Sequence, residues 1–171
     1  MIEKNRLNSS HILSRFVFLA GIVTLVFLYP ESIFGQTPAQ GYSAFNHDGD
    51  SVGIHGFDPV SYFNGKPAEG EPSISFTYHG VIYRFVNEAN RQKFSESPVK
   101  YEPQYGGWCA FAMGEKGEKV DINPLTYKIS DGKLYLFYNK YFTNTLNSWN
   151  KNEPELKHSA DQNWEKILNQ R

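Results

Sequence analysis

Cys109 and Met113 are the side chains best suited by type to bind a soft metal ion. They lie four residues apart, a spacing that places two side chains on the same side of a helical turn. Thiolate and thioether ligands favour Cu(I) over hard cations, and a histidine would complete a trigonal site. The alternative is that both residues fill the core, because free Cys is often buried and Met fills gaps.

The same cysteine also suggests nucleophilic chemistry. A thiol nucleophile needs a base within hydrogen-bond reach and a lowered pKa, and His55 and Asp58 would complete such a set with Cys109. Backbone N–H groups around Gly106 and Gly107 would then form an oxyanion hole. The chain contains no recognised catalytic motif, however. We therefore expect a protein without catalytic turnover.

Aromatic residues make up 16% of the chain, enough to build a core or to line a binding surface. Tyr62, Tyr101, Tyr105 and Trp108 form a candidate cleft for a small molecule or a partner protein, since each offers apolar area and a polar tip. Asp58 is read first as a helix cap, and it joins this ligand-binding set if its carboxylate lies in a pocket. The alternative is that these rings pack the core and its rim.

Charge and cysteine content exclude several classes of protein. The 17 Lys and Arg residues nearly balance the 18 Asp and Glu residues, and no short window is rich in Lys and Arg. This pattern argues against nucleic-acid binding, which needs a basic face toward the phosphates. A single Cys excludes an intrachain disulfide and an all-thiolate zinc site.

The N-terminal 35 residues have the pattern of a secretory signal peptide. Basic residues precede a charge-free apolar run over residues 16–29. At ~1.5 Å per residue this run falls short of the ~30 Å hydrocarbon core of a bilayer. We therefore expect a cleaved leader at residues 1–35, with an uncleaved anchor as the alternative. The protein would be exported, periplasmic or secreted, and would meet the membrane only through an uncleaved leader.

The remaining chain predicts an α+β domain. Residues 36–50 read as a linker. Two β-hairpins are expected where apolar alternation flanks His79-Gly80 and Asp131-Gly132. We expect a small antiparallel sheet of these two hairpins packed with short helices in a domain of residues 51–150, followed by a C-terminal helix over 151–171 that packs on it. Helices are predicted at residues 60–63, 88–95, 140–150 and 153–170, the last with an apolar stripe at Leu156, Ala160, Trp164 and Ile167.

The order of several motifs resembles the YHS domain family in its longer, exported, single-domain form. The motifs are GFDPVSYF at residues 56–63, YHGVIYRF at 78–85, YGGWCA at 105–110 and DGKLYL at 131–136. The resemblance covers roughly residues 51–149. It implies a small α+β domain, found alone or attached to metal-transport and monooxygenase proteins, in a family whose cysteine-bearing members are proposed to bind heavy metals.

This chain departs from the family at those cysteines. It has Ser61, Val86 and Asn90 where the short cysteine-bearing forms have Cys, so only Cys109 matches. The resemblance also places His55 near the first motif, and so favours His55 over His79 as the third ligand beside Cys109 and Met113. The sequence thus predicts an exported, non-catalytic binding module for a soft metal ion such as copper. The alternatives are an aromatic-lined module for a small ligand or partner protein, and third a Cys-dependent enzyme.

Overall fold

The computed structural model describes residues 44–170. These residues belong to one compact unit that spans residues 36–171. The predicted leader and the first part of the predicted linker lie outside the described residues. Residues 44–48 pack against the rest of the unit, where Ala44 is buried and His47 forms a bridge with Gly53. The packed part of the chain therefore begins before residue 51.

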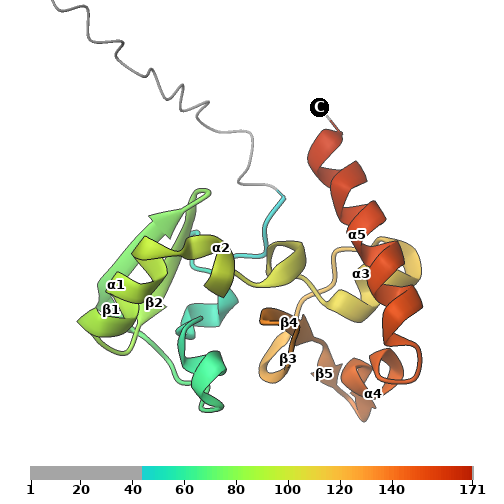
Figure 1. The fold of residues 1–171 in the computed structure, drawn as a ribbon, viewed down its shortest axis with the longest axis horizontal. Coiled ribbons are helices and arrows are strands. Elements are labelled where there is room, and N and C mark those ends of the chain that lie inside the picture. Colours follow the sequence, from blue (N-terminus) through green and yellow to red (C-terminus); the bar gives the residue numbers. More distant parts are fainter. Residues whose placement is uncertain (1–43, 171) are drawn as a thin grey trace, which may run out of the picture. The chain divides into compact units, whose positions relative to one another are not determined.

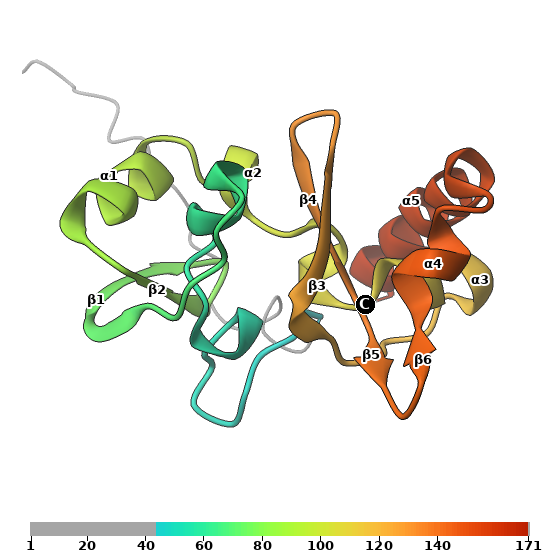
Figure 2. The ribbon, with the colours of Figure 1, turned by 90° about the horizontal axis from the view of Figure 1, so that it is seen from below.

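The predicted α+β class is confirmed (Figure 1). Both predicted hairpins are present, but they form separate two-stranded sheets, and a third short hairpin follows them (Figure 2). Irregular segments flank two of the strands through parallel bridges, from Val52 to Ile82 and from Pro103 to Leu134. The antiparallel pairs are β1 (Glu71–Tyr78) with β2 (Val81–Phe85), β3 (Asn123–Ser130) with β4 (Lys133–Phe137), and β5 (Asn139–Lys140) with β6 (Thr143–Asn144).

Short helices connect and cover these hairpins. Asn87 caps the first α-helix as predicted, because its side chain accepts a hydrogen bond from Asn90 N at 2.8 Å. The α-helices are α1 (Glu88–Glu96), α2 (Pro98–Tyr101), α3 (Ala110–Lys116), α4 (Thr145–Trp149) and α5 (Glu153–Asn169). Three 3₁₀ turns are η1 (Ile54–Gly56), η2 (Ser61–Asn64) and η3 (Gln104–Gly107).

The predicted helix over residues 140–150 is wrong in its first half. Residues 139–144 form the β5–β6 hairpin, with Tyr141 and Phe142 at its tip in left-handed backbone conformations. Helix α4 begins only at Thr145, because the Asn144 side chain accepts a hydrogen bond from Leu146 N and caps the helix there. An Asn side chain that bonds to nearby backbone favours such a cap over a helix interior.

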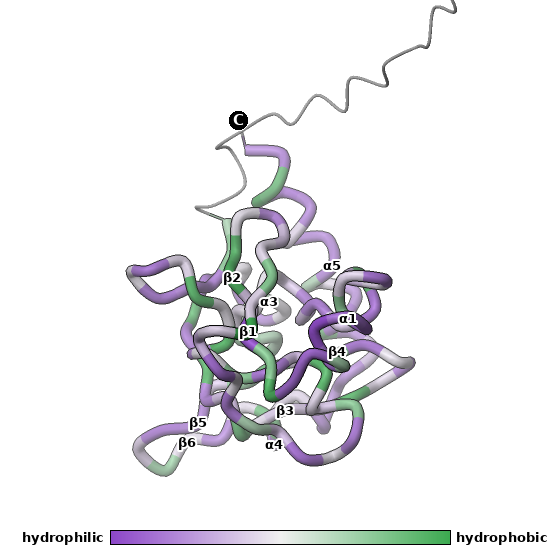
Figure 3. The backbone as a smooth tube through the Cα atoms, turned by 90° about the vertical axis from the view of Figure 1, so that its left-hand side faces the viewer, coloured by the Kyte–Doolittle hydropathy of each residue, from purple (hydrophilic) through white to green (hydrophobic). Residues whose placement is uncertain are grey.

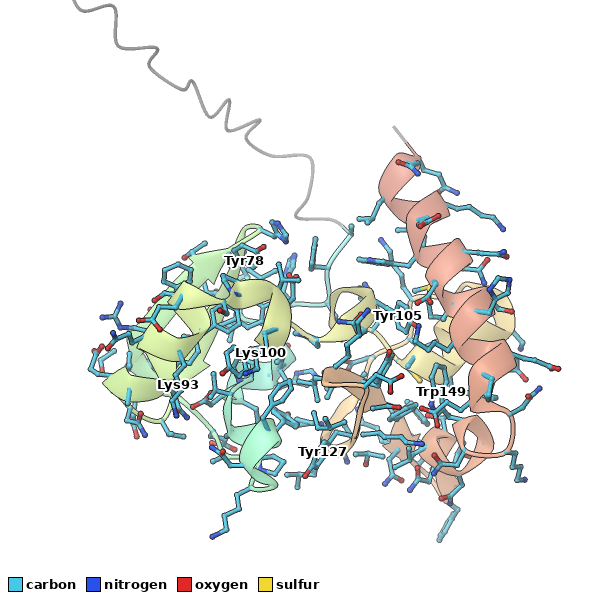
Figure 4. All side chains as sticks on the ribbon, in the orientation of Figure 1. Tyr78, Lys93, Lys100, Tyr105, Tyr127 and Trp149 are labelled. Carbon is cyan, nitrogen blue, oxygen red and sulfur yellow. The ribbon has the colours of Figure 1, made fainter. Side chains whose placement is uncertain are left out.

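Two hydrophobic clusters hold the unit together. The first surrounds Phe94 of α1, whose ring lies 4.8 Å from that of Tyr83 and 5.3 Å from that of Phe85. The second surrounds Trp149 of α4, whose ring lies 5.7 Å from that of Tyr135 (Figure 4). Cys109 belongs to the first cluster and Met113 to the second. The first cluster joins the β1–β2 hairpin and α1 to one face of β4, and the second joins the C-terminal helices to α3 and to the other face of β4.

Helix α5 packs very closely on α3. A Cβ added at Gly114 of α3 would lie 2.5 Å from the backbone oxygen of Leu156, so the two backbones approach as only a glycine permits. Asn163 of α5 donates a hydrogen bond to Met113 O at 2.9 Å and reinforces the contact. The predicted apolar stripe of α5 packs into the second cluster, and apart from Leu168 the other residues of the helix are hydrophilic (Figure 3).

The hydropathy of the helices also bears on membranes. Among residues 44–170, no helix is both long enough and apolar enough to span a bilayer.

Substituting Gly114→Ala should lower the free energy of unfolding by about 1–3 kcal/mol, because the added methyl group forces α3 and α5 apart. Gly49→Ala is the matched control, since a Cβ at Gly49 meets no atom within 4 Å, and it should change stability by less than about 1 kcal/mol. Urea denaturation measures both. Equal stabilities of the two variants would contradict the close approach described above.

Candidate functional site

A pocket of about 460 Å³ lies beside the η3 turn and α5. We call it the aromatic pocket. Its volume falls within the range of small-molecule sites. Tyr105, in its wall, is labelled in Figure 4. The pocket is lined by Phe45, His79, Val99, Glu102, Pro103, Gln104, Tyr105, Gly106, Lys133, Asp161, Trp164, Glu165 and Leu168.

One face of α5 forms a wall of the aromatic pocket. Its pocket residues are Asp161, Trp164, Glu165 and Leu168, whose spacing of three, four and seven residues places them on one side of a helix. The Trp164 ring meets the ring of Phe45 edge to face at 5.8 Å. This helix face therefore presents an indole, an aliphatic side chain and two carboxylates to the same space.

The facing wall is a left-handed turn. Tyr105, Gly106 and Gly107 have φ values of 56°, 60° and 84°. Gly106 cannot carry a side chain for two reasons. Its φ is positive, which strains any other residue, and an added Cβ would lie 2.7 Å from the Trp164 ring. The Tyr105 hydroxyl donates to Asp161 Oδ1 at 2.9 Å. Burial and the nearby Asp161 raise the pKa of Tyr105, so its phenol stays a neutral donor.

A polar chain holds this turn in place. Asn46 N donates to Gly106 O at 2.8 Å, and the Asn46 side chain donates to Gly107 O and to Asp121 Oδ1. The same Asp121 oxygen lies 3.0 Å from His55 Nε2. Burial alone would raise the pKa of Asp121, but hydrogen bonds from Asn46, Ile122 N and His55 bring that pKa below its usual value. Residues far apart in the sequence thus hold the backbone of the η3 turn in place beside the pocket.

Glu102 supplies a largely buried carboxylate. Its side chain is 16% exposed, and Oε1 lies 3.2 Å from His79 Nδ1. Burial raises the pKa of Glu102, while His79 and a hydrogen bond from Tyr83 lower it, and burial prevails. His79 lies 5.6 Å from the Phe45 ring, centroid to centroid. A carboxylate, an imidazole and a phenyl ring therefore meet at this end of the pocket.

The structure gives the predicted copper ligands separate side-chain partners. Cys109 is the N-cap of α3, and its carbonyl accepts a hydrogen bond from Met113 N at 3.0 Å. The two residues belong to different hydrophobic clusters. Both ring nitrogens of His55 face carboxylate oxygens, of Asp48 and Asp121. Across residues 44–170, no group of three His, Cys, Asp or Glu residues is arranged to hold a metal ion.

The Cys109 thiol is held by hydrogen bonds at the edge of a smaller pocket of about 190 Å³. Tyr138 N donates to Sγ at 3.4 Å, and Sγ lies 3.4 Å from Thr145 Oγ1. Because the Thr145 hydroxyl donates its one hydrogen to Tyr138 O, the thiol must be the donor toward Thr145. This arrangement suits a structural thiol that ties the residues on either side of the β5–β6 hairpin to the start of α3.

The other predicted ligand-binding residues are used within the fold, except Tyr105. Asp58 and Tyr62 are buried and line neither pocket, and the Tyr62 hydroxyl donates to Pro124 O at 2.9 Å. Trp108 also lies outside both pockets, and its Nε1 donates to Ala44 O at 2.6 Å. Of the predicted cleft, only Tyr105 lines the aromatic pocket.

Several pocket residues were missed by the sequence reasoning. Trp164 was assigned to the packing stripe of the C-terminal helix, and His79 to a turn. Phe45 fell in the predicted linker. The spacing of Asp161, Trp164 and Glu165 on one helix was a usable signal, because it places carboxylates beside an exposed indole edge. Nothing in the sequence indicated that residue 45 would lie next to this helix.

Asp58→Ala should lower the free energy of unfolding by about 3 kcal/mol or more. The Asp58 carboxylate is fully buried and accepts hydrogen bonds from Val60 N, Ser61 N, Val86 N and Asn90 Nδ2. Asp50→Ala, at an exposed carboxylate, is the control and should change stability by less than about 0.5 kcal/mol. Chemical denaturation compares them. Equal stability of both variants would show that Asp58 has no structural role.

A Cu(I) titration against a competing chelator, under anaerobic reducing conditions, tests the copper hypothesis. Because the Cys109 sulfur is hydrogen-bonded to Tyr138 N and Thr145, and Met113 packs in the other hydrophobic cluster, we expect the wild type and Cys109→Ala to bind Cu(I) equally. One-to-one binding tighter than micromolar that disappears in Cys109→Ala would contradict this expectation and support a metal site.

Comparison with family models, with curated proteins and with solved structures found no match to this chain. The resemblance to the YHS domain family therefore stays a prediction, and the function is inferred from the geometry of the site.

Proposed function

We propose that the protein is a non-catalytic binding module that takes a small molecule into the aromatic pocket. The observation that carries the proposal is the pocket itself, in which Trp164, Phe45 and Tyr105 surround a space of small-molecule size. The resemblance to exported YHS-type domains is compatible with such a role.

Exposed apolar walls support this proposal. Val99 is 74% exposed and Leu168 is 43% exposed, and both line the aromatic pocket. A ligand with apolar surface would cover them and gain the free energy of removing that surface from water. The Trp164 and Phe45 rings already pack against each other. Binding therefore costs little side-chain conformational entropy at these two residues.

The residues required by the two competing hypotheses, a metal site and a Cys-dependent enzyme, already contact other groups in the protein. Metal binding requires Cys109, Met113 and His55 to converge, but their contacts lie with different neighbours. A Cys-dependent enzyme requires a base at the Cys109 sulfur, and the two bonded groups there are an amide and a hydroxyl. The aromatic pocket already has the volume and the mixed apolar and polar lining of a small-molecule site, and it is the better-supported site.

Nuclear magnetic resonance of ¹⁵N-labelled protein titrated with 2-phenylethanol tests the proposal. We expect the shifted amides to cluster around Tyr105, Gly106 and Trp164, because the ring of the probe binds against the pocket wall that these residues form. Trp164→Leu should weaken binding about tenfold or more, since a Trp anchor of a pocket is lost. Phe142→Leu is the control, because it removes a fully exposed ring at the β5–β6 tip.

The outcome that contradicts the proposal is specific. Shifts scattered over the surface, or equal weakening by Trp164→Leu and Phe142→Leu, would show that the aromatic pocket is not a binding site. Thermal unfolding of both variants checks that each remains folded at the titration temperature.

A further inference from the structure

We propose that the aromatic pocket selects an organic cation, an ammonium or guanidinium group carried on an apolar body. This inference rests on the proposed function and adds the chemical class of the ligand. It follows from the combination of ring faces and carboxylates in one cavity, contributed by segments that are far apart in the sequence.

The charges around the cavity favour a positive ligand. Three carboxylates line it, those of Glu102, Asp161 and Glu165, against one ammonium group, that of Lys133. His79 is the other titratable base in the lining, and it already faces Glu102. When all three carboxylates are ionised, the lining therefore carries an excess of negative charge whether or not His79 is protonated.

The carboxylates differ in the hydrogen bonds and ion pairs that they already form within the protein. Asp161 accepts from the Tyr105 hydroxyl and from Lys157 Nζ at 2.8 Å. Glu165 is exposed, and its carboxylate has no hydrogen bond or ion pair within residues 44–170. Glu165 is therefore the carboxylate most available to a ligand, and Asp161 contributes a partly compensated charge.

Aromatic rings beside these carboxylates suit the same ligand. The faces of Trp, Tyr and Phe rings attract ammonium and guanidinium groups, and the attraction grows as water is excluded. Trp164 and Phe45 meet edge to face, an arrangement that turns at least one ring face away from the other ring. A cation with an apolar body would use both the ring faces and the exposed Val99 and Leu168.

The burial of Glu102 is consistent with this selection. Burial raises its pKa, so the ionised form is costly in the free protein, and a bound cation would stabilise that form. The affinity for a cation should accordingly fall as the pH is lowered through the pKa of Glu102, while the affinity for a neutral ligand should not follow that titration.

Three probes with the same ring and nearly the same length separate charge from shape. They are phenethylamine, 2-phenylethanol and phenylacetate, which are positive, neutral and negative at neutral pH. Titrated into the full chain at low ionic strength, phenethylamine should bind about fivefold or more tighter than 2-phenylethanol, and phenylacetate should bind most weakly. Added salt should lower the affinity for phenethylamine and leave the affinity for 2-phenylethanol unchanged.

Two surface variants give opposite expected effects. Glu165→Gln should lower the affinity for phenethylamine about twofold or more, and Lys133→Gln should raise it by a similar factor. Neither variant should change the affinity for 2-phenylethanol. Glu69→Gln is the matched control, because it removes an exposed carboxylate that does not line the pocket.

The result that overturns the inference is equal binding of amine and alcohol, or tightest binding of phenylacetate. In either case binding of 2-phenylethanol at the pocket would leave the proposed function standing. Absence of binding by all three probes would overturn the inference together with the proposed function.

Discussion

The close approach of α5 to α3 is the contact on which the candidate site depends. Gly114 allows the two helix backbones to meet near Leu156, and this position of α5 brings its later turns to the η3 loop. There a second glycine, Gly106, leaves room for the Trp164 ring. A side chain at either glycine would push the helix away. The wall of the aromatic pocket is thus set by backbone packing, and the ring positions follow from it.

The facing wall relies on polar contacts between distant segments. Asn46 bonds to the left-handed turn of Tyr105, Gly106 and Gly107, and Asp121 joins Asn46 to His55. Left-handed conformation is costly for a residue such as Tyr105, so these bonds also offset local strain. His55 was predicted to be a metal ligand, and the structure uses it to brace this network, one step removed from the pocket.

The sequence predicted the local elements better than the site. His79-Gly80 and Asp131-Gly132 identified two hairpins because these residues tolerate the positive φ that tight turns require. Tyr141-Phe142 makes a similar turn with residues that carry no such signal, so that hairpin was missed. The i, i+4 spacing of Cys109 and Met113 does mark the first turn of α3, but it could not show that the thiol is bonded to Tyr138 N and Thr145. The pocket joins residues from 45 to 168, and such long-range contacts leave no periodic pattern in a sequence.

An experimental structure of the protein with phenethylamine bound tests the central claim most directly. The account predicts the phenyl ring against Trp164 and the exposed Val99 and Leu168, with the ammonium group within hydrogen-bond or ion-pair distance of Glu102 or Glu165. Density for the amine beside Cys109, or at several surface positions with none in the aromatic pocket, would contradict it.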